Sequence, residues 1–459
     1  MTPVETLTAL AAEMPDCGLT FEVSEKYHGD WLMRAGPDDV PLALARPKTS
    51  EQVSHLLAAC NAARIPVVPQ GGLTGLTGGA VPSKGALLVS MERMIDVEPV
   101  DVAAQTVVVG AGVPLERIQE IADAAGLMFP LDIGSRGTCQ IGGNLSTNAG
   151  GNRVLRYGMA RALVLGLEVV LADGTIISSL NQMLKNNAGF DLKQMFIGSE
   201  GTLGIITRVV LRLVPKPRAM AVSLASFADY PQCERYLALA RTQLGDALSA
   251  FEVMWPDFYE RATARKAGAP PLPVGAGAYA LVEISTSDDS AEAQLGAFLE
   301  AALEAGIVED AVLAQSVQQT RTIWAIRDMG GELIQAYSPA GNFDLSVATS
   351  RIDSLVTQCC AVLEARWPGI ETIFFGHVCD GNIHLIAGGF GADQLEAVEL
   401  AVYQVTRDHQ GSISAEHGIG LHKRDHLGLS RTEAEIALMR TIKAALDPHN
   451  ILNPGKVLA

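Results

Sequence analysis

Residues 69–79 read Pro-Gln-Gly-Gly-Leu-Thr-Gly-Leu-Thr-Gly-Gly and directly follow a short β-branched run, Val67-Val68, that predicts a strand. Glycines at this density leave backbone N–H groups uncovered by side chains, and such groups can cradle a pyrophosphate. The stretch is not a Walker loop, because no Gly-Lys-Ser/Thr follows, and its GxxGxxG spacing differs from the GxGxxG of a Rossmann fingerprint. The sequence therefore predicts a phosphate-binding loop of another kind.

Three further glycine-rich segments repeat this theme. They are residues 130–135 (Pro-Leu-Asp-Ile-Gly-Ser), 141–151 (Ile-Gly-Gly-Asn-Leu-Ser-Thr-Asn-Ala-Gly-Gly) and 197–205 (Ile-Gly-Ser-Glu-Gly-Thr-Leu-Gly-Ile). A single phosphate does not need four such loops, whereas an extended ligand with a pyrophosphate, a ribityl chain and a ring system does. The segments therefore favour a dinucleotide, and a flavin fits them better than a nicotinamide.

Regular elements flank these loops in the first half of the chain. The runs 86–89 and 106–109 predict strands, and residues 50–63 predict a helix with Ser50 as its N-cap. The apolar face of that helix comprises Val53, Leu56, Leu57 and Cys60. Residues 213–218, Leu-Val-Pro-Lys-Pro-Arg, break both helix and strand and mark a candidate domain boundary.

The second half predicts an α+β region. Residues 279–284 predict a buried strand, and a surface loop rich in Gly, Ala and Pro precedes them at 268–277. A helix is expected to begin at Ser290 and to end at Gly306. Its apolar residues at helical spacing are Leu295, Phe298, Leu299, Ala302 and Leu303.

A histidine motif near the C-terminus indicates a metal site. It comprises residues 376–384, Gly-His-Val-Cys-Asp-Gly-Asn-Ile-His, and residues 415–418, Ala-Glu-His-Gly. Asp380-Gly381 is a turn signal, and such a turn folds His377 and His384 toward one point. The later Glu-His pair supplies a third ligand and a base, and two histidines with a carboxylate form a catalytic metal set. The alternative is that the hairpin histidines only make local hydrogen bonds.

Composition restricts the class of protein. The chain has 459 residues, of which 48% are hydrophobic and 19% charged, so we expect a well-packed enzyme of two or three domains. The formal net charge of −17 and a pI of about 5.0 argue against nucleic acid or an anionic membrane as a partner. An anionic substrate would therefore need a local positive charge from a metal or an arginine.

The sequence shows no targeting signal. Residues 1–5 contain no basic region, and the most apolar stretch, 162–172, is short and interrupted by Glu168, so we expect no membrane span. The seven cysteines are odd in number and form no CxxC, which predicts a reduced chain without a disulfide framework. We therefore expect a cytoplasmic protein.

Taken together, these motifs resemble the vanillyl-alcohol-oxidase/PCMH flavoprotein superfamily, and within it the FAD-linked D-2-hydroxy acid dehydrogenases. The resemblance is strongest to the D-2-hydroxyglutarate dehydrogenase branch and extends to D-lactate dehydrogenases and to the flavin subunit of glycolate oxidase. It covers nearly the whole chain. The segments that carry it are residues 30–32, 69–82, 191–207, 414–418 and 452–454.

The resemblance implies an α+β fold in three parts. Residues 1–216 would form a PCMH-type FAD-binding domain of two α/β subdomains. Residues 217–425 would form an α+β substrate and metal domain with an antiparallel sheet, and residues 426–459 would return to the FAD domain.

The resemblance also implies a set of cofactor-binding residues. FAD would be held noncovalently, because the covalent relatives use a His or Cys in the glycine-loop region and residues 69–82 contain neither. The implied residues are Pro69, Gln70, Gly71, Gly72, Leu73, Thr74, Gly75, Leu76, Gly79, Ala80, Pro130, Asp132, Gly134, Ser135, Gly142, Asn144, Thr147, Asn148, Gly150, Glu200, Gly204, Ile205 and Asn453.

For the chemistry, the resemblance implies a divalent metal, with zinc favoured, bound by His377, His384 and Glu416. His417 would be the catalytic base, and Arg327 would grip the substrate carboxylate. The metal would lower the pKa of the substrate 2-hydroxyl, and the C2 hydride would pass to flavin N5.

Three residues near the implied substrate pocket depart from the hydroxyglutarate pattern. Gly331 replaces a threonine, Asn342 a lysine and Ile386 an asparagine. A pocket that pairs a second carboxylate would need such polar groups, because an unpaired buried carboxylate is costly. We therefore expect a shorter or more apolar 2-hydroxy acid. The implied substrate pocket comprises Arg327, Asn342, Ile386 and His417.

The resulting hypothesis is an FAD- and metal-dependent dehydrogenase that oxidises a D-2-hydroxy acid to the 2-oxo acid. The electrons would pass to an electron-transfer flavoprotein or a quinone-linked carrier. A homodimer is the expected assembly. Two alternatives stay open. One is a non-catalytic flavin-carrying subunit of a glycolate-oxidase-like complex, and the other is a metal-free flavin oxidase of the same superfamily.

Overall fold

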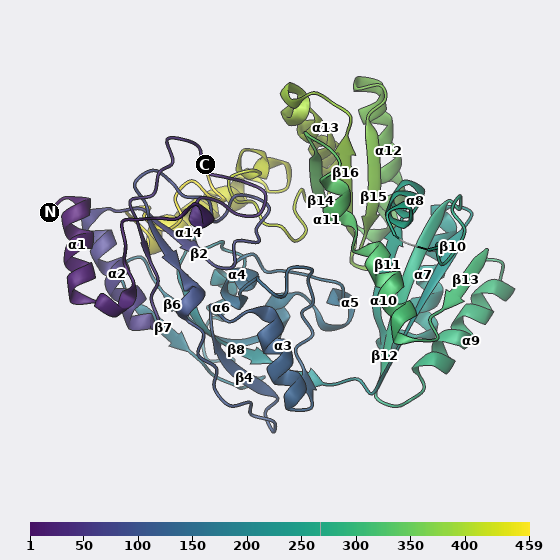
Figure 1. The fold of residues 1–459 in the computed structure, drawn as a ribbon, viewed down its shortest axis with the longest axis horizontal. Helices are drawn as coiled ribbons and strands as arrows, with labels where there is room; N and C mark the ends of the chain where they lie inside the picture. Colours follow the sequence, from purple (N-terminus) through teal and green to yellow (C-terminus); the bar gives the residue numbers. More distant parts are fainter. Residues whose placement is uncertain (267) are drawn as a thin grey trace. The chain divides into compact units, whose positions relative to one another are not determined.

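The computed structural model describes residues 1–266 and 268–459 of the chain. These residues divide into two compact units (Figure 1). The first unit comprises Met1–Gly151, Tyr157–Pro215 and Glu416–Ala459, and the second comprises Asn152–Arg156 and Lys216–Ala415. The first unit therefore unites the N-terminal part of the chain, drawn from purple through blue to teal in Figure 1, with the C-terminal segment, drawn in yellow.

The first unit contains three small sheets. The strands β1, β3 and β2 form a parallel sheet, β4, β8, β6 and β7 form an antiparallel sheet, and β5 pairs with β9. Its helices are α1 (Pro3–Glu13), α2 (Ser50–Ala63), α3 (Leu115–Ala124), α4 (Ile141–Ser146), α6 (Lys193–Phe196) and α14 (Glu433–Leu446), and α5 (Val154–Tyr157) crosses into the second unit. Its strands are β1 (Ala43–Ala45), β2 (Val67–Gln70), β3 (Leu87–Ser90), β4 (Thr106–Gly110), β5 (Leu127–Met128), β6 (Val164–Val170), β7 (Ile176–Ser179), β8 (Ile205–Arg212) and β9 (Val214–Pro215).

Most of the elements predicted for the first unit are confirmed. The strands at 67–68, 86–89 and 106–109 appear as β2, β3 and β4 within a residue or two. The apolar stripe of α2 is fully buried, because Val53, Leu56, Leu57 and Cys60 each have 0% exposure. Residues at this spacing share one helix face, and that face packs into the unit's core.

The predicted N-cap of α2 is wrong by one residue. Thr49 caps the helix, since its hydroxyl accepts a hydrogen bond from the N–H of Gln52 at 3.3 Å. Ser50 is the first helical residue, and its Oγ donates instead to the buried Glu168 carboxylate at 2.5 Å. The sequence offers two adjacent capping residues, and this distant carboxylate engages one of them.

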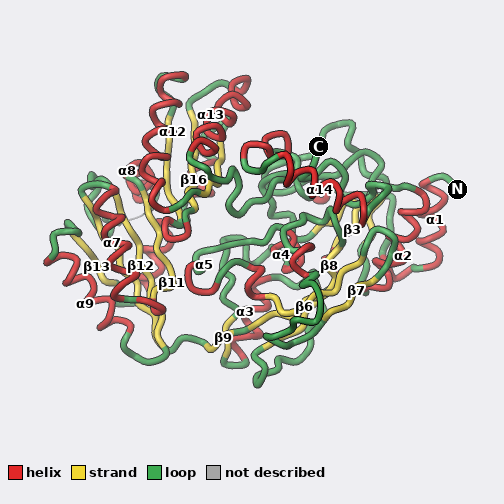
Figure 2. The backbone as a smooth tube through the Cα atoms, turned by 180° about the vertical axis from the view of Figure 1, so that it is seen from behind, coloured by secondary structure: helices red, strands yellow, loops and turns green. Residues whose placement is uncertain are grey.

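The second unit is built on one seven-stranded antiparallel sheet in the order β13-β10-β12-β11-β15-β16-β14, drawn as yellow tube in Figure 2. Its strands are β10 (Ala219–Phe227), β11 (Leu248–Met254), β12 (Ala278–Thr286), β13 (Asp310–Leu313), β14 (Gly341–Ser346), β15 (Glu371–Gly376) and β16 (Asn382–Gly388). Its helices are α7 (Tyr230–Gln243), α8 (Pro256–Ala264), α9 (Ala291–Glu304), α10 (Val317–Arg327), α11 (Gly330–Ile334), α12 (Ile352–Arg366) and α13 (Leu395–Asp408).

The helix and strand predicted for this unit are confirmed as α9 and β12. Ser290 is the N-cap of α9, although its hydroxyl makes no capping hydrogen bond, and Gly306 follows the helix at φ 65°. Leu303 is an exception to the predicted apolar stripe, because it is 42% exposed. None of the described helices combines the length and the apolar character that a membrane span requires.

The predicted hairpin in the histidine motif is confirmed, with a longer connection than a tight turn. β15 and β16 pair antiparallel, so that Phe375 lies opposite His384. A 3₁₀ turn at Val378–Asp380 joins the strands, and Gly381 closes it at φ 85°, a backbone conformation that favours glycine.

Candidate functional site

In the first unit, the glycine loop leaves the end of β2 and is fixed by polar side chains. The Asp30 carboxylate accepts a hydrogen bond from the N–H of Gly78 at 2.7 Å. The Gln70 side-chain amide donates to the carbonyls of Tyr27 and Ala80, each at 2.9 Å. These bonds shape the loop without using the other backbone N–H groups along it, which suits a ligand-binding turn.

Close backbone packing explains two of the predicted glycines. A Cβ on Gly72 would lie 2.1 Å from the carbonyl oxygen of Thr138, and one on Gly142 would lie 2.7 Å from Cβ of Ala111. Gly142 belongs to α4, the helix that opens the glycine-rich segment 141–151. By contrast, a Cβ on Gly143 in the same helix meets no other atom of the described residues within 4 Å.

This contrast predicts opposite outcomes for two alanine variants. Gly72→Ala should destabilise the unit by about 1–3 kcal/mol, because the clash is with backbone and the loop must shift. Gly143→Ala should keep or slightly raise stability, since alanine is favoured over glycine by roughly 1 kcal/mol in a helix. Denaturant unfolding of the FAD-free proteins measures both, and a Gly72→Ala protein as stable as wild type would contradict the contact.

Four buried amide oxygens in the first unit have no hydrogen-bond partner among the described residues. They belong to Gln70, Gln140, Asn144 and Asn453. Buried amides are normally satisfied, so four such acceptors on the glycine segments and the C-terminal tail fit a ligand that brings hydroxyl and N–H donors. Gln140 is absent from the sequence-based set. The sequence signal that could have found Gln140 was its position directly before the glycine-rich segment 141–151, where it is the N-cap residue of α4.

The C-terminal tail is tied to the same loops. The Asn453 N–H donates to the carbonyl of Val67 at 2.8 Å, and its side-chain amide donates to the carbonyls of Gly79 and Glu200 at 3.0 and 2.8 Å. The Lys456 ammonium donates to the carbonyl of Val81 at 2.8 Å, and burial lowers its pKa to about 8. The tail therefore holds both ends of the glycine loop.

Glu200 anchors the segment that carries the Glu416-His417 pair. Its carboxylate accepts hydrogen bonds from the N–H groups of Ile419 and Gly420 at 2.7 and 2.8 Å. Burial raises the pKa of Glu200, and these two backbone donors oppose the rise. Glu200 was predicted as a cofactor residue, and its carboxylate accepts hydrogen bonds from the protein backbone.

The predicted ligand Glu416 and the predicted base His417 also have partners in the first unit. Glu416 Oε1 accepts a hydrogen bond from the N–H of Gly151 at 2.8 Å, and a Cβ on Gly150 would lie only 1.9 Å from that oxygen. The carbonyl of His417 accepts a hydrogen bond from the Thr77 hydroxyl at 3.2 Å. The predicted cofactor residue Gly150 thus makes room for the Glu416 carboxylate.

The other predicted cofactor residues all lie in the first unit. Residues 71–80 form the glycine loop after β2, Pro130 to Ser135 follow β5, and Thr147 to Gly150 follow α4. Gly204 directly precedes β8, and Ile205 begins it.

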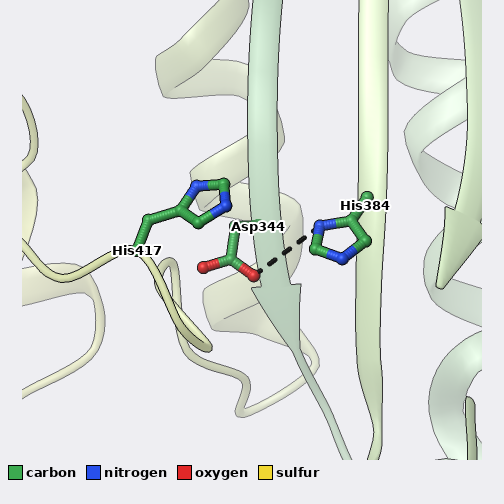
Figure 3. Close-up of side chains that lie close together, drawn as sticks. All are labelled: Asp344, His384 and His417. Carbon is green, nitrogen blue, oxygen red and sulfur yellow. Dashed lines mark ion pairs between the residues drawn. The ribbon is translucent and has the colours of Figure 1, made fainter. Parts of the chain in front are cut away.

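In the second unit, the hairpin brings His377 and His384 together. Their ring centroids are 5.5 Å apart, and a nitrogen of each ring lies within 4.8 Å of the other. Asp344 on β14 is the direct partner of His384 in the strand register, with Oδ1 3.8 Å from Nδ1 (Figure 3). Both histidines are nearly buried, at 5% and 8% exposure, and Asp344 is fully buried. This buried His/Asp cluster has the ligand chemistry of a divalent metal site.

Asp344 is a candidate ligand that sequence reasoning missed. A hydrogen bond from the Asn382 amide at 2.9 Å fixes the carboxylate. The available signal was an aspartate inside the otherwise apolar strand Phe343-Asp344-Leu345. The chain also returns to this strand at Ser414, which forms a parallel bridge with Asp344, and His417, drawn in Figure 3, follows three residues later.

The predicted carboxylate-binding Arg327 ends α10 and contacts several side chains of the second unit. Its Nε donates to Glu252 Oε2 at 2.8 Å, and its NH2 group lies 2.9 Å from His377 Nε2. The guanidinium also lies over the ring of Phe375, 5.6 Å from its centroid. Arg327 therefore lies directly beside one of the predicted metal ligands.

The predicted pocket residues Asn342 and Ile386 are also strand partners. They pair across β14 and β16, two residues from the Asp344–His384 pair, so all four side chains project from the same face of the sheet. Ile386 is 2% exposed and belongs to an apolar cluster with Ile326. The sheet register thus places two apolar or neutral side chains next to the candidate ligands.

Comparison with known proteins adds the family. Residues 41–179 match the model of an FAD binding domain, and residues 216–457 match that of the C-terminal domain of FAD linked oxidases. The chain is 40% identical to a D-2-hydroxyglutarate dehydrogenase of Xanthomonas citri pv. viticola, covering 94% of this chain and 92% of that protein. It is 38% identical to the mitochondrial D-2-hydroxyglutarate dehydrogenase of Bos taurus, covering 98% and 83%.

A solved structure supports the fold. The chain superimposes on p-cresol methylhydroxylase with substrate bound at a TM-score of 0.77, over 99% of this chain and 96% of that one. The sequence identity is 17%, so this likeness concerns the fold alone.

Proposed function

Because the chain belongs to the FAD-linked oxidases, we propose that it oxidises a D-2-hydroxy acid to the 2-oxo acid with the help of a divalent metal, zinc in our proposal. The observation that carries the proposal is the pair His377 and His384 on one hairpin beside Asp344, in a chain that also matches an FAD-binding domain. A non-catalytic flavin-carrying subunit would not need this cluster.

The residues of the first unit fit FAD. The four unsatisfied amide oxygens and the backbone N–H groups of the glycine loop would hold its hydroxyl groups and its pyrophosphate. When bound, FAD supplies the acceptor for the hydride that leaves C2 of the acid. We expect noncovalent binding, since residues 69–82 contain neither His nor Cys.

In the proposed metal site, His377, His384 and Glu416 are the ligands. Glu416 is two residues beyond Ser414 in the chain. Ser414 forms a bridge with Asp344 on β14, the edge strand that pairs with the strand of His384. When bound, the metal supplies Lewis-acid polarisation of the substrate 2-hydroxyl and carboxylate. His417 would take the hydroxyl proton on a ring nitrogen, and the Arg327 guanidinium would bind the carboxylate in a bidentate pair.

We further propose that the preferred acid is shorter or more apolar than 2-hydroxyglutarate. The pairing of Asn342 with Ile386 beside His384 supports this, because neither side chain can neutralise a second carboxylate. Gly331 offers room for a larger residue, since its built Cβ meets no atom within 4 Å in the described part of the chain.

The combined variant Gly331→Thr, Asn342→Lys, Ile386→Asn should shift specificity toward D-2-hydroxyglutarate. We expect its kcat/KM for that acid, relative to D-lactate, to rise about tenfold or more, since a hydrogen bond to a charged group contributes roughly 1.5–3 kcal/mol. Steady-state kinetics on both acids measure the ratio. Asn342→Gln is the matched control, because it lengthens the side chain without adding charge. A wild-type protein that already prefers D-2-hydroxyglutarate strongly would refute the proposal on the side chain.

The proposed function itself is tested by anaerobic bleaching of the bound flavin. A panel of D-2-hydroxy acids should reduce the flavin in the metal-loaded protein, whereas the L-enantiomers should not. Flavin that no acid bleaches would support the alternative of a non-catalytic subunit, and full bleaching after metal removal would support a metal-free oxidase. Reoxidation by an electron-transfer flavoprotein or a quinone, rather than by oxygen, would identify the proposed class of electron acceptor.

A further inference from the structure

One buried carboxylate in the second unit serves two of the proposed site residues. Glu252 lies on β11 and is 1% exposed. Its Oε1 is 2.6 Å from Nδ1 of His377, and its Oε2 accepts the hydrogen bond from Nε of Arg327 at 2.8 Å. Because it forms an ion pair with the always charged Arg327 guanidinium, the carboxylate is an ionised acceptor.

These contacts determine which nitrogen of His377 carries the proton. An ionised carboxylate only accepts hydrogen bonds, so Nδ1 of His377 must be protonated and donate to Glu252. A guanidinium only donates, and the NH2 group of Arg327 is nearer to Nε2, at 2.9 Å, than to Nδ1, at 3.4 Å. His377 is thus a neutral imidazole that accepts at Nε2, and the electron pair of this nitrogen is the one that a metal would bind.

We propose that Glu252 is a positioning residue that fixes His377 for metal binding and Arg327 for substrate binding. A carboxylate that accepts from the far nitrogen of a histidine ligand orients the ring and makes it a stronger ligand. The same carboxylate holds Arg327 with its NH2 group beside His377 Nε2. A metal bound at Nε2 would take this electron pair in place of that NH2 group, which would then turn to the carboxylate of an acid, so metal binding should strengthen the hold of Arg327 on the acid. This inference rests on the proposed function.

The chain offers a matched control in Glu283 on the neighbouring strand β12. Glu283 is also 1% exposed and also pairs with an arginine, at 3.0 Å between its Oε1 and Nε of Arg153. Its other neighbour is the Ser249 hydroxyl, which donates at 3.0 Å, and no histidine among the described residues bonds this carboxylate. Loss of charge at either position removes a buried ion pair from the same sheet, so both variants bear a similar structural cost.

The test compares Glu252→Gln with Glu283→Gln in the full-length, FAD-loaded protein. Zinc affinity is measured by competition with a chelator, alongside FAD content and thermal unfolding. We expect Glu252→Gln to weaken zinc binding about 10–100-fold, the usual effect of losing the partner of a histidine ligand. Glu283→Gln should leave zinc affinity unchanged while losing comparable thermal stability. Equal zinc affinities in the two variants would overturn the role of Glu252.

A second readout concerns the acid. In wild type, saturating zinc should tighten the binding of pyruvate, the 2-oxo product of D-lactate oxidation, measured by equilibrium titration of the oxidised protein with this nonreacting acid. This coupling should disappear in Glu252→Gln and persist in Glu283→Gln. Coupling that survives in both variants counts against the inference.

Glu252→Asp is a second test variant, which serves if the Glu252→Gln protein does not fold. Aspartate keeps the charge but is one methylene shorter, so it cannot reach both partners at their present positions. It should fold and lose zinc affinity, whereas Glu283→Asp should fold and keep it, and a Glu252→Asp protein with wild-type zinc affinity would contradict the inference. A wild-type protein that binds no zinc would instead overturn the proposed function, and this inference with it.

Discussion

Replacement of His384 by glutamine is expected to abolish turnover while the protein keeps its FAD. Glutamine is close to histidine in size but is a poor ligand for zinc, so the variant should lose the metal. We expect kcat/KM to fall by about 10³-fold or more, since Lewis-acid stabilisation of a developing alkoxide contributes several kcal/mol and each 1.36 kcal/mol is a factor of ten. The segments predicted to bind FAD lie in the first unit and His384 in the second, so FAD content should not change.

His409→Gln is the matched control for this variant. His409 also lies in the second unit, but among the described residues its ring bonds no proposed site residue: its partners are the carbonyl of Val405 at 2.9 Å and the Ser354 hydroxyl at 2.7 Å. Its variant should keep zinc, FAD and turnover. Chelation of the wild-type protein should reproduce the loss seen in His384→Gln, and added zinc should restore turnover only in wild type. Full activity after chelation would exclude the metal-dependent mechanism.

Local features of the site could be predicted from the sequence. The approach of His377 and His384 follows from a turn signal between two short strands, which needs no knowledge of distant residues. Motifs of this kind carry their own geometry, because the backbone between their parts is short.

Partners from distant strands could not be predicted in this way. Glu252 is 125 residues from His377, and only the pairing of β11 with β15 brings them together. In β11 every residue is buried, so alternation of polar and apolar residues gives no indication of which face Glu252 occupies. Ser50 illustrates the same limit, since the glutamate that engages its hydroxyl is 118 residues away. Sheet order is a property of the whole chain, and single-sequence patterns do not encode it.

His417→Asn is expected to lower kcat by about 10²–10⁴-fold, the usual contribution of a general base. Asparagine keeps a polar side chain but cannot accept the hydroxyl proton, so FAD and zinc should both remain bound. The backbone carbonyl of residue 417 would still accept from Thr77, and Glu200 would still hold the following turn, so the segment should keep its place. Kinetics with and without added imidazole, together with zinc and FAD analysis, measure the effect, and imidazole should restore part of the rate.

The zinc content of the His417→Asn protein decides between two roles for this imidazole. The proposed ligands His377 and His384 offer two ring nitrogens, so by its chemistry the third ligand is either the Glu416 carboxylate or the His417 imidazole. Loss of zinc together with turnover would make His417 a ligand and leave the base to another group. Retained zinc with lost turnover, matched by loss of zinc in Glu416→Gln, would establish the proposed division. His449→Gln is the control, because His449 is an exposed histidine of the same unit whose ring bonds Asn61 at 3.1 Å, and its loss should change neither readout.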